Sequence, residues 1–160
     1  MRTVRLRLYV PQLAARDVYE TLADFERYPQ LSEAVQDVLV TEVSDDVTIS
    51  RWEVTFRAGL LRWTEEDRFD RTSLTIAFRQ LEGDVALFDG TWQCVDVGGG
   101  CEITFRARLD MGIPSLADAL EPIAVRALID NTVSIVVGLL GTAELVSSEV
   151  TAPPTVGSRS

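Results

Sequence analysis

Apolar and polar residues alternate through the middle of the chain, and toward its end the apolar spacing becomes that of a helix. A period of two is typical of a strand with one buried face. Short turns separate the alternating segments, so we expect an antiparallel meander with one continuous apolar face. Its strands are predicted at residues 48–56, 61–69, 74–80, 86–96 and 101–111.

The segments before the meander follow the same logic. Alternation predicts strands at 4–10 and 35–43. Between them we expect a helix at 13–23 and a short helical stretch around Tyr28 and Pro29. The two strands extend the sheet.

The last third of the chain supplies a cover for the apolar face. From 115 to about 146, apolar side chains recur at helical spacing, which predicts a long helix packed on the sheet. Pro122 lies inside this helix and lacks a backbone N–H, so we expect a kink or a break there. We expect one domain at 1–147, followed by a polar, proline-containing tail at 148–160 that is disordered.

The register of the meander can also be predicted, because opposed residues in a tight hairpin point to the same face. A two-residue turn at 58–59 places Trp52 opposite Glu65, and a turn at 71–72 places Glu65 opposite Phe78. A three-residue turn at 82–84 and a turn at 98–99 define the other two hairpins. Their opposed pairs are Phe78 with Phe88, and Trp92 with Phe105.

The charge and the choice of basic residues exclude several classes of function. The net charge of −10 opposes binding to nucleic acid, because that affinity comes largely from cationic side chains. All fifteen basic residues are arginine, so lysine Schiff bases, histidine triads and histidine metal sites are ruled out. Cys94 and Cys101 are expected to be reduced thiols, which without histidine make a poor zinc site. We expect neither a cofactor nor a metal.

The chain shows no pattern typical of export or of a membrane span. Its first residues alternate basic and apolar side chains and lack an apolar segment followed by a cleavage site. The longest uninterrupted apolar stretch, 135–140, is far shorter than the roughly 20 residues that cross a bilayer. We therefore expect a cytoplasmic protein.

Two acids lie on the predicted apolar face. Glu65 and Asp67 interrupt the inward side of the strand at 61–69, whose outward side is already charged. Glu65, expected between Trp52 and Phe78, is in surroundings that raise a carboxyl pKa, whereas Asp67 is expected to be more hydrated. About 7 Å apart along one strand, they could divide proton donation and abstraction in an enolisation or dehydration. Alternatively, they lie at the wet mouth of a cavity or pair with an arginine across the sheet.

A resemblance to a known family rests on four segments: ADFERYP at 23–29, RWTEEDRFD at 62–70, FDGTW at 88–92 and GIPSLADALEPIAVRALIDN at 112–131. With the order of predicted elements, these resemble the polyketide cyclase/dehydrase branch of the START-like (SRPBCC, helix-grip) superfamily over residues 3–145. The resemblance implies an α+β helix-grip fold, in which a curved antiparallel sheet wraps around the long C-terminal helix and encloses a cavity. Members act as aromatase/cyclases or carry quinones and other lipids.

The resemblance also bears on individual residues. In the aromatase/cyclases, the strand matching 62–70 points an aromatic, a small polar residue and an arginine into the cavity. The matching positions here are Trp63, Glu65 and Asp67, so an acid replaces the arginine. Tyr28 matches an aromatic that borders the cavity entrance in the family. Its hydroxyl could donate to a ligand carbonyl or hold the junction between helix and sheet.

Large aromatic side chains gather on the inward face and are expected to line the cavity. They are Trp52, Trp63, Phe78, Phe88, Trp92 and Phe105. On the long helix, Asn131 could add a polar contact to a ligand. The alternative is an ordinary filled core without a pocket.

The sequence favours one function and leaves two alternatives. The first is a cofactor-free cyclase or dehydratase for a polyketide-like hydrophobic intermediate, with Glu65 and Asp67 as the acid/base pair. The second is a non-catalytic carrier of a lipid, quinone or other hydrophobic small molecule, which needs the cavity but no proton transfer. The third is a subunit whose edge strand or long helix mediates assembly, for example as a homodimer.

Overall fold

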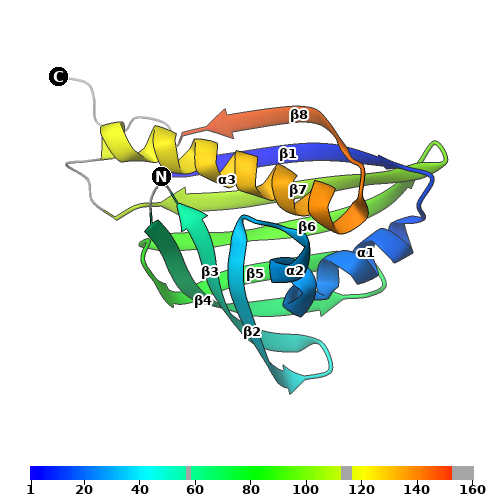
Figure 1. Ribbon diagram of the computed structural model, residues 1–160, viewed down its shortest axis with the longest axis horizontal. Coiled ribbons are helices and arrows are strands. Elements are labelled where there is room, and N and C mark those ends of the chain that lie inside the picture. The colour runs from blue at the N-terminus through cyan, green and yellow to red at the C-terminus, as the bar shows by residue number, and fades with distance from the viewer. Residues whose placement is uncertain (57–58, 113–116, 153–160) are drawn as a thin grey trace.

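A curved antiparallel sheet dominates the computed structural model, which describes residues 1–56, 59–112 and 117–152, the side chains of 117–119 excepted (Figure 1). Its strand order is β2-β3-β4-β5-β6-β7-β1-β8. The strands are β1 (Arg2–Pro11), β2 (Val35–Ser44), β3 (Val47–Phe56), β4 (Gly59–Asp70), β5 (Thr75–Gly83), β6 (Leu87–Val97), β7 (Gly100–Asp110) and β8 (Glu144–Thr151). The helices are α1 (Ala15–Ala23), η1 (Phe25–Arg27), α2 (Tyr28–Leu31) and α3 (Ala117–Leu140).

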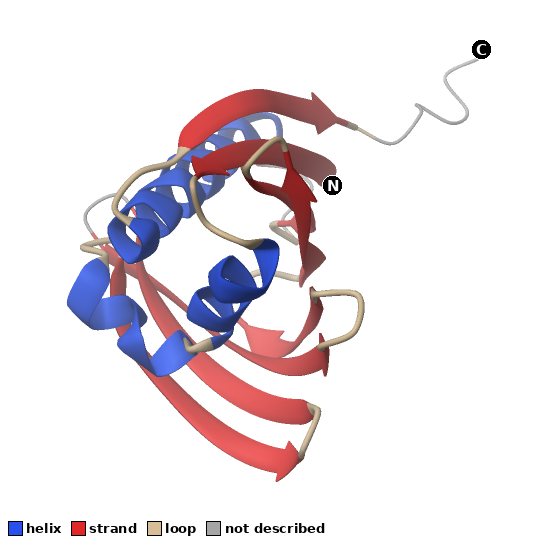
Figure 2. Ribbon diagram, turned by 90° about the vertical axis from the view of Figure 1, so that its right-hand side faces the viewer, coloured by secondary structure: helices blue, strands red, loops and turns tan. Residues whose placement is uncertain are grey.

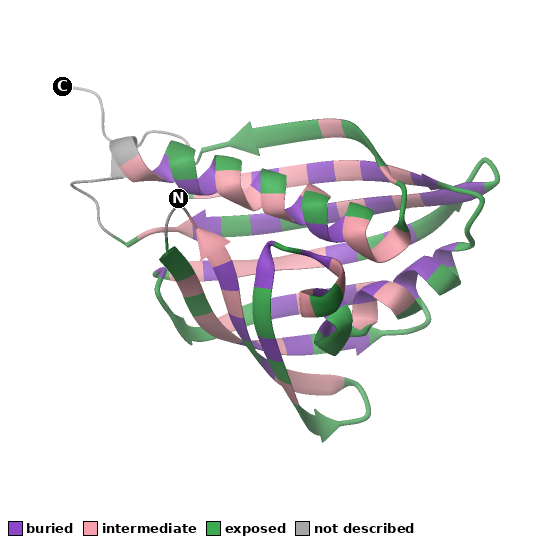
Figure 3. Cartoon of the chain, in the orientation of Figure 1, coloured by how far each residue is buried: buried purple, intermediate pink, exposed green. Residues whose placement is uncertain are grey.

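The sheet curves around the helices, as the end-on view shows (Figure 2). Strand β1 illustrates how the sequence pattern positions the core. Val4, Leu6, Leu8 and Val10 are fully buried, while the residues between them are only partly buried (Figure 3). A strand buried on one face must be covered on that face, and α3 provides the cover. The helix-grip fold is therefore confirmed.

The register of the meander differs from the predicted one by two residues in three hairpins. Trp52 lies opposite Trp63 rather than Glu65. Phe78 lies opposite Asp67 rather than Glu65. A two-residue shift keeps every side chain on its predicted face, because side chains alternate along a strand with period two. The predicted faces are thus confirmed, and the predicted partners are wrong.

Glycine explains one of these shifts. Phe78 lies opposite Gly90 rather than Phe88. A Cβ atom at Gly90 would lie 2.8 Å from Cζ of Phe78, so the ring uses space that only glycine leaves. Between β6 and β7 the prediction is confirmed, and Trp92 lies opposite Phe105.

The turn between β4 and β5 explains the register shift of that hairpin. It spans residues 71–74 rather than two residues. The Asp70 carboxylate accepts hydrogen bonds from the backbone N–H groups of Ser73 and Thr72, each 3.0 Å long, and these bonds lower the pKa of Asp70. An aspartate that bonds the following backbone in this way stabilises a turn, and the longer turn moves β5 by two residues against β4.

Helix α3 is continuous from Ala117 to Leu140, so Pro122 does not break it. It ends before the predicted boundary near 146, because Gly141 follows with φ of +79°, a left-handed conformation that ends helices. The predicted beginning at 115–116 lies outside the described residues.

The chain after α3 departs furthest from prediction. Residues 148–151, predicted to be disordered, belong to β8, which pairs with β1 at the edge of the sheet. Almost every residue of β8 is exposed (Figure 3). A strand with little to bury carries no hydrophobic pattern, which is why the sequence did not reveal it. Residues 153–160 of the predicted tail lie outside the described chain.

By length and composition, α3 would also qualify as a membrane-spanning helix. The segment Leu120–Leu140 has 21 residues and a mean hydropathy of 1.8. The longest uninterrupted apolar stretch, 135–140, is much shorter than this segment because Arg126 and Asp130 interrupt the apolar residues before it. One third of the most apolar part of this segment is buried, and side chains on the inner face of α3 line the cavity described below.

Candidate functional site

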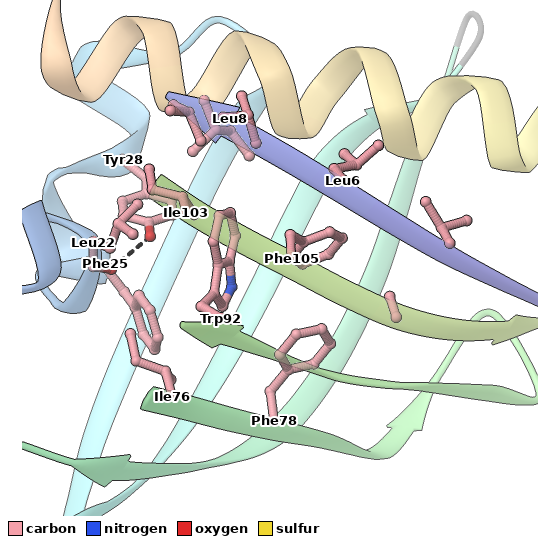
Figure 4. Packing of buried hydrophobic residues seen from close by; sticks show 14 of the residues in the cluster. Leu6, Leu8, Leu22, Phe25, Tyr28, Ile76, Phe78, Trp92, Ile103 and Phe105 are labelled. Carbon is pink, nitrogen blue, oxygen red and sulfur yellow. Dashed lines mark hydrogen bonds between the residues drawn. The ribbon is translucent and has the colours of Figure 1, made fainter. Parts of the chain in front are cut away.

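A cavity of about 110 Å³ lies between the concave face of the sheet and α3. Its walls are mostly apolar, and they include each of the six aromatic residues expected there: Trp52, Trp63, Phe78, Phe88, Trp92 and Phe105. Figure 4 shows Phe78, Trp92 and Phe105 projecting from neighbouring strands into the interior. Arg62 and Asp84, which are exposed, also line the cavity, so it reaches the surface at that end.

The aromatic rings contact one another across the strands. Trp52 and Trp63 stack with centroids 5.9 Å apart and planes inclined by 2°. The ring of Phe88 meets Trp63 edge-on, at 5.3 Å and 89°. Such pairs add about 0.5–1.5 kcal/mol beyond the burial of their area. The cavity is smaller than the ~150 Å³ that holds a benzene ring, so a larger ligand must move these rings or extend through the opening at Arg62.

The two acids are both buried, with exposed fractions of 5% for Glu65 and 0% for Asp67. Glu65 lines the cavity and accepts a hydrogen bond of 2.6 Å from Nε1 of Trp63. Asp67 lies outside the cavity lining. Its Oδ2 accepts hydrogen bonds from Oγ of Ser50 (2.6 Å) and Oγ1 of Thr48 (2.9 Å). The expectation that Asp67 is the more hydrated acid is wrong, because Ser50, already predicted beside it, and Thr48, brought opposite it by the shifted register, both donate hydrogen bonds to it in the interior.

The Glu65 and Asp67 carboxyl groups lie two residues apart on the inward face of β4. Burial raises the pKa of Glu65 well above its ordinary value. The neighbouring Asp67 carboxyl group raises it further, while the Trp63 N–H lowers it. Oδ1 of Asp67 is buried and receives no hydrogen bond from the described residues. The raised pKa favours the neutral form of Glu65, whose carboxyl group faces the apolar cavity.

Tyr28 and Asn131 also line the cavity, with polar atoms already engaged inside the protein. The Tyr28 hydroxyl donates to the carbonyl oxygen of Leu22 at 2.5 Å and so holds α2 to α1 (Figure 4). Burial raises the pKa of this hydroxyl well above its ordinary value. The side-chain N–H of Asn131 donates to the carbonyl oxygen of Thr55 at 3.0 Å. The Tyr28 hydroxyl thus joins two helices rather than a helix and the sheet as expected, and its contact with a ligand stays a prediction.

Two polar residues of the site were not predicted from the sequence. Thr48 donates a hydrogen bond to Asp67. The sequence held a signal for this contact, because Thr48 and Ser50 both lie on the inward face of β3. The predicted register placed Thr48 past Asp67 along the strand, so the contact was missed. Thr132 is buried on α3, next to Asn131, and lines the cavity. Across the described residues, no three Cys, Asp or Glu side chains are placed to hold a metal ion.

Comparisons with solved structures agree with this architecture. A protein from Thermus thermophilus superposes with a TM-score of 0.80 and 26% identity, over 87% of this chain and 94% of the other. The Zhui aromatase/cyclase from Streptomyces sp. R1128 has a TM-score of 0.73 and 20% identity, over 87% and 92%. A START superfamily protein from Mycobacterium smegmatis has a TM-score of 0.75 and 12% identity, over 88% and 98%. The last two likenesses establish a shared fold.

The family follows from the sequence match. No curated protein matches the chain. The family model described as polyketide cyclase/dehydrase and lipid transport matches residues 12–132, which include both acids and the cavity-lining strands β3 to β7. Aromatase/cyclases and lipid-binding proteins both occur among these relatives. The chain therefore belongs to the polyketide cyclase/dehydrase and lipid transport family, with START-like proteins as its structural neighbours.

Proposed function

We propose that this protein is a cofactor-free cyclase or dehydratase that acts on a polyketide-like intermediate held in the cavity. The observation that carries the proposal is the buried carboxyl group of Glu65, which faces an otherwise apolar, aromatic-lined space. A carboxyl group in a water-poor site, with a pKa raised towards the working pH, can both donate and accept a proton.

One carboxyl group suffices for a dehydration. As a carboxylate, Glu65 removes the proton α to a ketone of the substrate. The bond to the β-hydroxyl group then breaks, and Glu65 returns the proton to the departing oxygen, so that water leaves and a conjugated enone remains. The raised pKa makes the Glu65 carboxylate a stronger base than an ordinary carboxylate.

Asp67 has a different role from the one first expected. Because it lies behind Glu65 and outside the cavity lining, it is a positioning residue rather than a group that touches substrate. Its carboxyl group, next to Glu65 on the same face of β4, raises the pKa of Glu65.

The test uses a β-hydroxy ketone that carries a phenyl ring on the hydroxyl carbon, because its dehydration product absorbs in the near ultraviolet. The Glu65→Gln variant keeps the shape of the side chain and is expected to lose roughly 10² to 10⁴ in rate, the contribution of one proton-transfer group. Glu82→Gln, at an exposed position on β5, is the matched control. Wild-type turnover in Glu65→Gln would refute the proposal.

A carrier function is the second candidate, and one observation favours it. Two of the other polar side chains around the cavity are bonded to the protein itself: Asn131 donates to Thr55, and Arg62 donates to Glu53. A site built to carry a hydrophobic molecule needs no free polar groups. Native mass spectrometry of the purified protein tests this function: a bound small molecule that is released unchanged, and that Glu65→Gln also binds, would support a carrier.

A further inference from the structure

The outer face of the sheet, which points away from the cavity, carries a hollow across four neighbouring strands. These strands are β8, β1, β7 and β6, which lie side by side in the sheet (Figure 1). The lining of the hollow includes three arginines, Arg5, Arg106 and Arg108, and two acids, Asp89 and Glu149. The hollow therefore carries a net positive charge in a protein whose overall net charge is −10.

Two of these arginines face each other across neighbouring strands. Arg5 on β1 lies directly opposite Arg106 on β7. The residues on either side of each arginine are buried in the core, so both arginine side chains point outward from the same face of the sheet. The Cβ atoms of directly opposed residues are about 5 Å apart, and like charges at such positions are destabilising. An anion between the two guanidinium groups would remove this repulsion.

The acids of the hollow leave the two arginines without a counter-ion. Asp89 binds Arg108 through two hydrogen bonds, of 2.9 and 2.6 Å, which occupy both of its carboxylate oxygens. Glu149 lies opposite Arg5 on β8, but its side chain is exposed. Over the part of the chain that the structure describes, neither Arg5 nor Arg106 forms an ion pair. Their two positive charges are therefore available to a ligand.

Arg5 also has a hydrogen-bond donor that the fold does not satisfy. Its Nε is buried and has no acceptor among the described residues. A buried donor without an acceptor destabilises the folded state. A ligand that draws the Arg5 guanidinium into the hollow would supply this acceptor, so the binding of an anion relieves a cost that the protein bears alone.

Two guanidinium groups match a phosphate group better than a carboxylate. A planar guanidinium can bond two oxygens at once, so a single arginine already occupies both oxygens of a carboxylate. A phosphate monoester has three terminal oxygens and a charge of about −1.5 to −2 near neutral pH, which balances two arginines. Thr91, opposite Arg106 on β6, also lines the hollow, and its hydroxyl is a further donor.

We propose that this hollow binds a phosphate group, which Arg5 and Arg106 hold together with Thr91. Arg106 and Glu149 are exposed at the hollow, so the organic part of a phosphate monoester can extend into solvent. The site therefore accepts inorganic phosphate and small phosphate monoesters. It lies on the other face of the sheet from the cavity and does not depend on the function proposed for Glu65.

The test follows the Nε–H signals of the arginines by nitrogen NMR in the full chain. Sodium phosphate and, separately, methyl phosphate are added, and sodium chloride at matched ionic strength is the reference. The Arg5 signal is assigned by its absence from Arg5→Gln. Arg106→Gln removes half of the pair. Arg51→Gln is the matched control, because Arg51 is an exposed arginine on the outer face of β3 and its loss changes the net charge equally.

We expect phosphate, but not chloride, to shift the Arg5 signal until it saturates. Arg106→Gln should weaken binding by roughly tenfold or more, the effect of losing one hydrogen bond to a charged group, while Arg51→Gln keeps the wild-type affinity. Methyl phosphate should bind about as tightly as inorganic phosphate; binding of inorganic phosphate alone would still support the site and would assign it to the free ion. The absence of a saturable shift beyond that of chloride would overturn the proposal. Equal weakening in Arg106→Gln and Arg51→Gln would also overturn it, because the anion would then respond only to the overall charge of the protein.

Discussion

The raised pKa of Glu65 makes the stability of the protein depend on pH in a direction that can be tested. The folded protein holds the Glu65 proton to a higher pH than the unfolded chain, whose carboxyl group titrates near 4.5. Unfolding above that pH releases a proton, so stability is highest below it and falls as the pH rises towards the folded-state pKa. The loss within this window is about 1.4 kcal/mol for each pH unit.

Glu65→Gln isolates this effect. A glutamine can accept the Trp63 N–H through its oxygen and, like a protonated glutamic acid, carries no charge beside Asp67. Below the pKa of the unfolded chain, near 4.5, the variant and the wild type should have the same free energy of unfolding. Above it, the variant should become more stable than the wild type, by about 1.4 kcal/mol per pH unit until Glu65 ionises in the folded state.

Urea unfolding at several pH values between 4 and 8 measures the difference in unfolding free energy. The exposed Glu82→Gln serves as the control and is expected to show a difference that does not grow with pH. A constant difference between Glu65→Gln and the wild type would refute the reasoning, because it would mean that Glu65 ionises alike in the folded and unfolded chains.

Further predictions concern the cavity wall, the helix packing and the edge strand. Trp63→Phe removes the N–H that stabilises the Glu65 carboxylate, so the pKa of Glu65 should rise further in a carboxyl-carbon NMR titration, and an unchanged midpoint would contradict the hydrogen bond. Gly138→Ala should destabilise the protein by about 1–3 kcal/mol in chemical denaturation, because the added Cβ would overlap the carbonyl oxygen of Leu31; unchanged stability would disprove this close approach. Backbone amides of β8 should exchange with deuterium faster than those of β7, since β8 is almost wholly exposed, and equal protection would show that β8 is part of the stable core.

The alternation of the sequence determined the elements and their faces. Because side chains in a strand alternate, Trp63, Glu65 and Asp67 had to share one face whichever residues they opposed. The spacing of apolar residues likewise predicted the long helix, since a sheet with one apolar face must be covered. The family resemblance and the aromatic lining of the cavity followed from these same positions.

The tertiary structure decided what alternation leaves open. A shift of two residues changes no face, so the pattern could not tell that Trp52 opposes Trp63, or that Thr48 lies opposite Asp67 and donates to it. The turn at 71–74 and the space at Gly90 set the register of β5 against β4 and against β6. Strand β8 depends on backbone pairing with β1, far away in the sequence, and its exposed residues carry no hydrophobic signal. The pattern of the sequence thus determined which groups enter the interior, and long-range pairing decided which of them meet.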